Sequence, residues 1–120
     1  MANTMLETGQ VKSAAYNGAT QLDISGITGD CTLFFRLESL TAGKNCYFQF
    51  QDSVNAFTAN QPVASFAFSG AADVRSDITV SMRLYQNKGL RAGTASAVLR
   101  IVLASIDAGG TAQYSAWISY

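Results

Sequence analysis

Residues Asp77–Tyr85, with the sequence DITVSMRLY, alternate between polar and apolar side chains along their whole length. Ile78, Val80, Met82 and Leu84 fall on one side of this alternation, and the residues between them fall on the other. A period of two is typical of a β-strand that buries one face and exposes the other. The segment therefore predicts a half-buried strand and points to an all-β fold.

Similar runs flank this strand on both sides, and glycines separate them at intervals that suit short strands. The expected strands cover residues 11–16, 20–24, 31–37, 45–51, 61–68, 77–85, 94–106 and 112–119. About eight short strands at this spacing predict a two-sheet antiparallel sandwich with a jelly-roll-like arrangement. We expect a single domain over residues 11–120, preceded by a flexible N-terminal arm over residues 1–10.

Two turns and one ambiguous segment refine this expectation. Asn17-Gly18 is a strong tight-turn dipeptide and predicts a hairpin between the first two strands. Pro62 cannot donate to a ladder, so its strand should begin there or lie at a sheet edge. Ala95–Ile106 is long enough for a buried helix, but its β-branched residues favour a strand.

The two cysteines, Cys31 and Cys46, are expected to be free thiols. We interpret residues 31–37 and 45–51 as a hairpin in which Phe35 faces Phe48 and Leu37 faces Cys46. Cys31 then lies six residues from the position opposite Cys46. At about 3.3 Å per residue the separation is roughly 20 Å, which is too long for a disulfide.

The composition argues for a binding role and against catalysis. The chain has no histidine, which removes the commonest general base and zinc ligand, and no phosphate-binding glycine loop. We expect no enzyme activity and no cofactor. The eight acidic residues fit turn capping, because most of them stand where turns begin or end. Asp52, Ser53, Asn55 and Asn60 could hold calcium, but their spacing favours a loop held by side-chain-to-backbone hydrogen bonds.

The low charge of the chain limits the partners that we expect. Only 13% of residues are charged, the net charge is zero, and no block of like charge suggests nucleic acid or a membrane as partner. A surface with so few charges favours association, so we expect a homo-oligomer, a dimer or a trimer. The first ten residues lack the features of a secretion signal, which indicates folding in a cytoplasm.

The aromatic and basic residues supply two kinds of candidate contact. Most phenylalanines fit a core, namely Phe34, Phe35, Phe48, Phe50, Phe66 and Phe68. Tyr47, Tyr85, Trp117 and Tyr120 are better candidates for an exposed face that could bind sugar. Arg75, Arg83, Lys88 and Arg91 surround one strand and its following loop, and arginine is favoured in protein interfaces.

Several local features resemble the small capsid decoration, or cement, proteins of tailed bacteriophages. They are the start Met1-Ala2-Asn3-Thr4, the loop Asp52–Phe57, and Arg83-Leu84-Tyr85 leading to Leu99-Arg100-Ile101. The resemblance implies a β-domain that folds in the host cytoplasm, binds the major capsid protein on the outside of an assembled head, and stabilises that head. The candidate contacts are Met1, Ala2, Asn3, Thr4, Met5, Leu6, Arg75, Lys88 and Arg91.

Two other functions remain open from the sequence. One is another virion part, such as a tail or fibre accessory domain. The other is a carbohydrate-binding β-sandwich module with Tyr47, Tyr85 or Trp117 as its platform.

Overall fold

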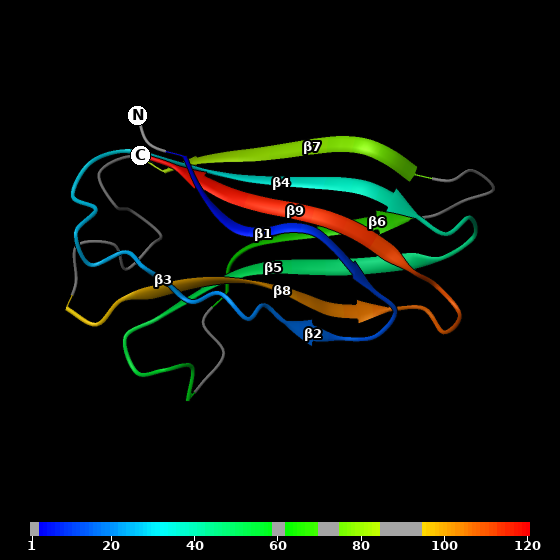
Figure 1. The fold of residues 1–120 in the computed structure, drawn as a ribbon, viewed down its shortest axis with the longest axis horizontal. Helices are drawn as coiled ribbons and strands as arrows, with labels where there is room; N and C mark the ends of the chain where they lie inside the picture. The colour runs from blue at the N-terminus through cyan, green and yellow to red at the C-terminus, as the bar shows by residue number, and fades with distance from the viewer. Residues whose placement is uncertain (1–2, 59–61, 70–74, 85–94) are drawn as a thin grey trace.

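The computed structural model describes residues 3–58, 62–69, 75–84 and 95–120, and within these ranges every regular element is a β-strand. Two antiparallel sheets pack face to face, which confirms the predicted all-β sandwich (Figure 1). The four-stranded sheet has the order β1 (Asn3–Lys12), β9 (Ala112–Ser119), β4 (Cys31–Leu40) and β7 (Arg75–Leu84). The five-stranded sheet has the order β2 (Tyr16–Asn17), β8 (Val98–Ile106), β5 (Asn45–Ser53) and β6 (Pro62–Ser69), and β3 (Leu22–Asp23) also pairs with β8.

An aromatic cluster fills the space between the sheets. The ring centroids of Phe35 in β4 and Phe48 in β5 lie 4.4 Å apart, and both side chains are fully buried. Tyr114 of β9 packs against both rings from the same sheet as Phe35. The expected pairing of Phe35 with Phe48 is therefore confirmed, because alternation along β4, β5 and β9 directs these side chains inward.

The two rings meet across the sandwich and not across a hairpin, so the predicted hairpin of residues 31–37 and 45–51 is wrong. β4 pairs with β7 and β9, whereas β5 pairs with β6 and β8. Residues 41–44 carry the chain from one sheet to the other, with Gly43 at a φ of 78°. Alternation fixes which face of each strand is buried, but a hairpin and a crossing between sheets bury the same faces.

Both cysteines are free and buried, as expected. Burial raises the pKa of Cys46 to about 11, and the nearby Asp107 carboxylate adds to this effect. Burial also raises the pKa of Cys31, with a further contribution from Asp30. Both groups are therefore neutral thiols over the physiological pH range.

Thiol labelling tests this state of the cysteines. The native protein should react slowly with a disulfide reagent at about pH 8, because the thiolate is the reactive form and both pKa values are raised. In denaturant without reductant, both cysteines should react quickly. Rapid labelling of the native protein, or no labelling after denaturation, would contradict the assignment of two buried free thiols.

The N-terminal segment is a strand, so the expected flexible arm is wrong for residues 3–10. β1 pairs with β9 from Asn3 opposite Ser119 to Lys12 opposite Ala112. Its register shifts on both sides of Glu7, and Leu6 and Glu7 are buried in succession. Such bulges break the period of two, which is why the alternation did not reveal this strand.

Asn17-Gly18 does not form the predicted hairpin turn. β2 and β3 instead pair with successive parts of β8, with Tyr16 opposite Leu103 and Leu22 opposite Leu99. Gly18 is buried, and its N–H donates to the carbonyl of Ile101 at 2.8 Å. The glycine is required here for a close approach of two backbones and not for a tight turn.

Three other expectations are confirmed. Residues 98–106 form strand β8 and not a helix. β6 begins at Pro62 and lies at the edge of its sheet. β7 contains the alternating segment, and Val80 and Met82 pack against the core while Thr79 and Ser81 are exposed.

Candidate binding surfaces

The N-terminal contact candidates have different environments. Asn3 and Met5 are exposed, and Met5 retains 43% of its accessible surface. Thr4 is half-buried, with its hydroxyl 3.4 Å from that of Tyr120. Leu6 is 1% exposed and belongs to the core, so it cannot be a surface contact as expected. Met1 and Ala2 lie outside the described residues.

The structure does not bring Arg75, the one basic contact candidate among the described residues, next to the N-terminus. Arg75 begins β7 opposite Leu40, whereas Asn3 is opposite Ser119, which in turn faces Thr32. Thr32 and Leu40 stand at opposite ends of β4, about 26 Å apart at 3.3 Å per residue (Figure 1). Lys88, Arg91 and the sugar-platform candidate Tyr85 lie outside the described residues.

The core of the sandwich is incompletely buried along one side. On this side, β6 and β7 are the last of the described strands in their sheets. Phe35 of β4 contacts Phe66 and Phe68 of β6, with centroid distances of 5.7 Å, which places β6 across the sandwich from β4. We call the inward-facing but only half-buried side chains along these strands the β6–β7 side: Phe66, Phe68, Val80 and Met82. Among the described strands, β7 pairs only with β4.

A second surface lies on the outer face of the four-stranded sheet. Phe34 was expected in the core, and this expectation is wrong. Phe34 neighbours the inward-facing Phe35 along the strand, so its side chain points outward. Its ring stacks on that of Trp117, with centroids 5.2 Å apart and an angle of 10° between the planes. Both side chains are half-buried. Trp117 therefore lies on the outer face, as expected of a candidate for an exposed face, whereas Tyr114, Ala116 and Ile118 are buried.

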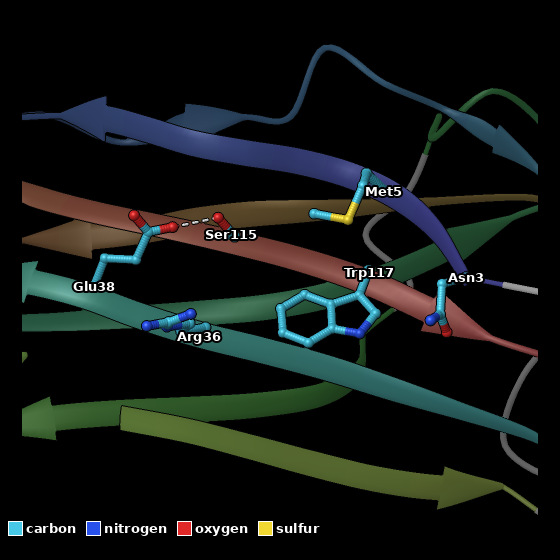
Figure 2. Close-up of a pocket in the computed structure, with 6 residues that line it drawn as sticks. All are labelled: Asn3, Met5, Arg36, Glu38, Ser115 and Trp117. Atoms are coloured by element: carbon cyan, nitrogen blue, oxygen red, sulfur yellow. Dashed lines mark hydrogen bonds between the residues drawn. The ribbon is translucent and has the colours of Figure 1, made fainter. Parts of the chain in front are cut away.

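A shallow groove of about 390 Å³ opens beside Trp117. We call it the Trp117 groove, and its lining residues are Asn3, Met5, Arg36, Glu38, Ser115 and Trp117 (Figure 2). They come from β1, β4 and β9, which lie side by side in the sheet. Figure 2 shows Asn3 near one end of the indole, with Arg36 and Glu38 beyond the other end.

At the floor of this groove, Ser115 of β9 links two irregular strands, β1 and β4, which flank β9 in the sheet. The N–H of Gly9, in the irregular part of β1, donates to Ser115 Oγ at 2.9 Å, and Gly9 has a φ of 59°. Ser115 Oγ donates in turn to Glu38 Oε1. β4 shifts register between Leu37 and Ser39, so Glu38 is the additional residue of a bulge. Bulges redirect side chains, and here they hold one carboxylate in a fixed position.

Sequence reasoning missed Arg36, Glu38 and Ser115 as groove residues. Arg36 and Ser115 sit at ordinary outward positions of their strands, where nothing distinguishes them from solvated polar groups. Glu38 depends on a bulge that has no clear pattern in the sequence. A signal was present in Phe34-Phe35, since adjacent residues of a strand cannot both face the same core.

The outer face of the five-stranded sheet carries a hydrogen-bonded row of polar side chains. Arg100 donates to Gln51 Oε1 through Nε at 3.1 Å and Nη2 at 2.8 Å, Gln51 donates to Gln49 at 2.9 Å, and Gln49 donates to the hydroxyl of Tyr47 at 3.2 Å. The Arg100 guanidinium carbon lies 3.9 Å from the ring centroid of Phe57. Tyr47 is therefore tied into this row through its hydroxyl.

The loop after β5 has the side-chain-to-backbone hydrogen bonds that its spacing favours. Ser53 Oγ accepts hydrogen bonds from the N–H groups of Asn55 and Phe57, both at 3.0 Å. Asp52 and Ser53 are fully buried, and Asn60 lies outside the described residues. Within the described ranges, no three His, Cys, Asp or Glu side chains gather where they could hold a metal ion. No helix in those ranges could span a membrane.

Comparisons with family models, curated proteins and solved structures find no match to this chain.

Proposed function

We propose that this chain is a capsid decoration protein that docks on an assembled bacteriophage head through its β6–β7 side. The observation that carries the proposal is the incomplete burial of Phe66 and Phe68, two rings that pack against the core cluster and are only half-buried. Covering such apolar side chains contributes roughly 25 cal/mol per Å² of buried area. A partner surface that covers this side of the domain therefore gains binding free energy.

The edge strand β7 supplies the second part of the interaction. An edge strand presents unpaired N–H and C=O groups that can pair with an extended segment of another protein. Arg75 and Arg83 lie within β7, and Lys88 and Arg91 follow it in the sequence. This basic content favours a partner segment with acidic residues, because complementary charges guide association.

Binding of this kind stabilises a shell by mass action, since the protein binds the assembled form and not the separated subunits. The low charge of the whole chain supports a surface that is covered in use. The N-terminal strand takes no part in this docking, because β1 lies at the opposite edge of the four-stranded sheet.

Co-sedimentation tests the proposal. Purified protein should pellet with expanded phage heads that lack a decoration protein. Arg75→Glu should weaken binding about threefold to tenfold, because the reversed charge repels an acidic partner segment.

Lys12→Glu is the matched control, since Lys12 lies in β1 at the far edge of the same sheet. This variant should pellet like the original protein. Equal losses for both substitutions would indicate non-specific charge attraction, and failure of the original protein to pellet would reject the decoration function.

A further inference from the structure

We propose that the Trp117 groove binds a pyranose ring of a neutral saccharide. The groove lies on the outer face of the four-stranded sheet, whereas docking uses the β6–β7 side, so this inference does not depend on the proposed function. Its volume of about 390 Å³ lies at the lower end of the range for small-ligand sites.

The indole of Trp117 supplies the apolar surface of the site. Phe34 stacks on the ring and fixes its orientation, and Phe34 is not among the residues that line the groove. The groove therefore opens on the part of the indole that Phe34 leaves uncovered. The C–H groups of a pyranose form a flat apolar patch that packs on such a ring, while its hydroxyls remain available for hydrogen bonds.

Three polar side chains line the groove at the two ends of the indole and carry the groups that sugar hydroxyls require. Arg36 is a planar donor, Glu38 is an acceptor, and Asn3 offers both functions. Planar side chains with two parallel sites can bind two neighbouring hydroxyls at once. In Figure 2 Asn3 lies near one end of the indole and Arg36 beyond the other, so a ring on Trp117 would direct hydroxyls toward polar groups at both ends, and Glu38 lies farther along the groove.

The carboxylate is positioned before any ligand binds. Ser115 holds Glu38 Oε1, and the Gly9 N–H holds Ser115, so two bulged strands fix this acceptor. A group that is already in place loses little conformational entropy on binding, which raises affinity for a small ligand. This arrangement distinguishes the groove from a surface on which polar side chains move independently.

The charges of the groove favour a neutral ligand. Arg36 and Glu38 offset each other, so an acidic sugar would bring its charge close to Glu38 without a second cation among the lining residues. A protein partner fits less well, because a stable protein interface needs about 800 Å² on each side and a shallow groove beside one indole offers less.

The experiment uses the full chain and its single tryptophan. Cellohexaose, maltohexaose, xylohexaose, mannohexaose and chitohexaose are titrated separately while Trp117 emission and calorimetric heat are recorded. At least one of them should bind saturably, and the emission should change with the same dissociation constant. No binding by any of them, binding without a change in emission, or binding of hyaluronan oligosaccharides alone would overturn the proposal.

Variants locate the site. Trp117→Ala should weaken binding at least about tenfold, and the exposed Arg36→Ala should weaken it several-fold without involving the core. Tyr47→Ala is the matched control, because Tyr47 is a half-buried aromatic residue on the outer face of the other sheet, and it should bind normally. Loss in Tyr47→Ala with full binding in Arg36→Ala and Trp117→Ala would overturn the assignment. Trp117→Ala should still pellet with phage heads, so the two proposals can fail separately.

Discussion

Phe35→Ala should lower the free energy of unfolding by about 3–5 kcal/mol, the largest loss that we expect from a single substitution. The ring of Phe35 contacts four other aromatic rings, Phe48, Phe66, Phe68 and Tyr114, and it joins the two sheets at the centre of the sandwich. Its removal leaves a cavity that rigid neighbours on both sheets cannot fill. Urea unfolding followed by circular dichroism measures the loss.

Phe34→Ala is the matched control, because it removes the same side chain from the neighbouring residue on the outer face of the same strand. It should cost clearly less than Phe35→Ala, because Phe34 is only half-buried, and its pairing with Trp117 adds about 0.5–1.5 kcal/mol beyond the area that it buries. Equal losses at the two positions would contradict the assignment of the inner and outer faces of β4.

Gly18→Ala should lower the free energy of unfolding by about 1–3 kcal/mol or more, although it adds only one methyl group. A Cβ at this position would lie 2.5 Å from the carbonyl oxygen of Ile101 and 3.1 Å from Glu7 Oε1. The carbonyl belongs to β8, so relief requires separation of the two backbones and loss of the hydrogen bond from Gly18 to Ile101. The same movement disturbs Glu7, which accepts a hydrogen bond from the Ala19 N–H at 3.0 Å.

Gly26→Ala provides the comparison, since a Cβ at Gly26 would have no heavy atom within 4 Å. This substitution should be neutral or slightly stabilising, by about 0.4–1 kcal/mol, because alanine restricts the unfolded chain. If thermal melts show that the two variants lose similar stability, the close approach at Gly18 is not the cause.

The buried faces of the strands could be predicted from the sequence because each residue of a regular strand has one of two directions. Tyr114, Ala116 and Ile118 follow this rule, as do Val80 and Met82. Strand partners could not be predicted in the same way. β4 and β5 are joined by a short connection that suits a hairpin, yet the two strands belong to different sheets.

The groove could be predicted only in part, because strand irregularities position some of the residues at its floor. Trp117 was expected on an exposed face, and Asn3 and Met5 were expected as surface contacts. The position of Glu38 depends on one additional residue in β4, and the hydrogen bond that Ser115 accepts comes from Gly9 in the irregular part of β1. Local hydropathy does not record these shifts, since they arise when strands from distant parts of the chain are paired.

The docking of this domain on an assembled head is tested most directly by an image of the complex. Expanded heads that lack a decoration protein are mixed with the purified chain and imaged by electron cryomicroscopy with averaging over the capsid symmetry. We predict additional density of sandwich shape outside the shell, with β6 and β7 against the capsid and the Trp117 groove facing away from that contact. Heads without additional density, or a sandwich attached through β1, would contradict the proposal.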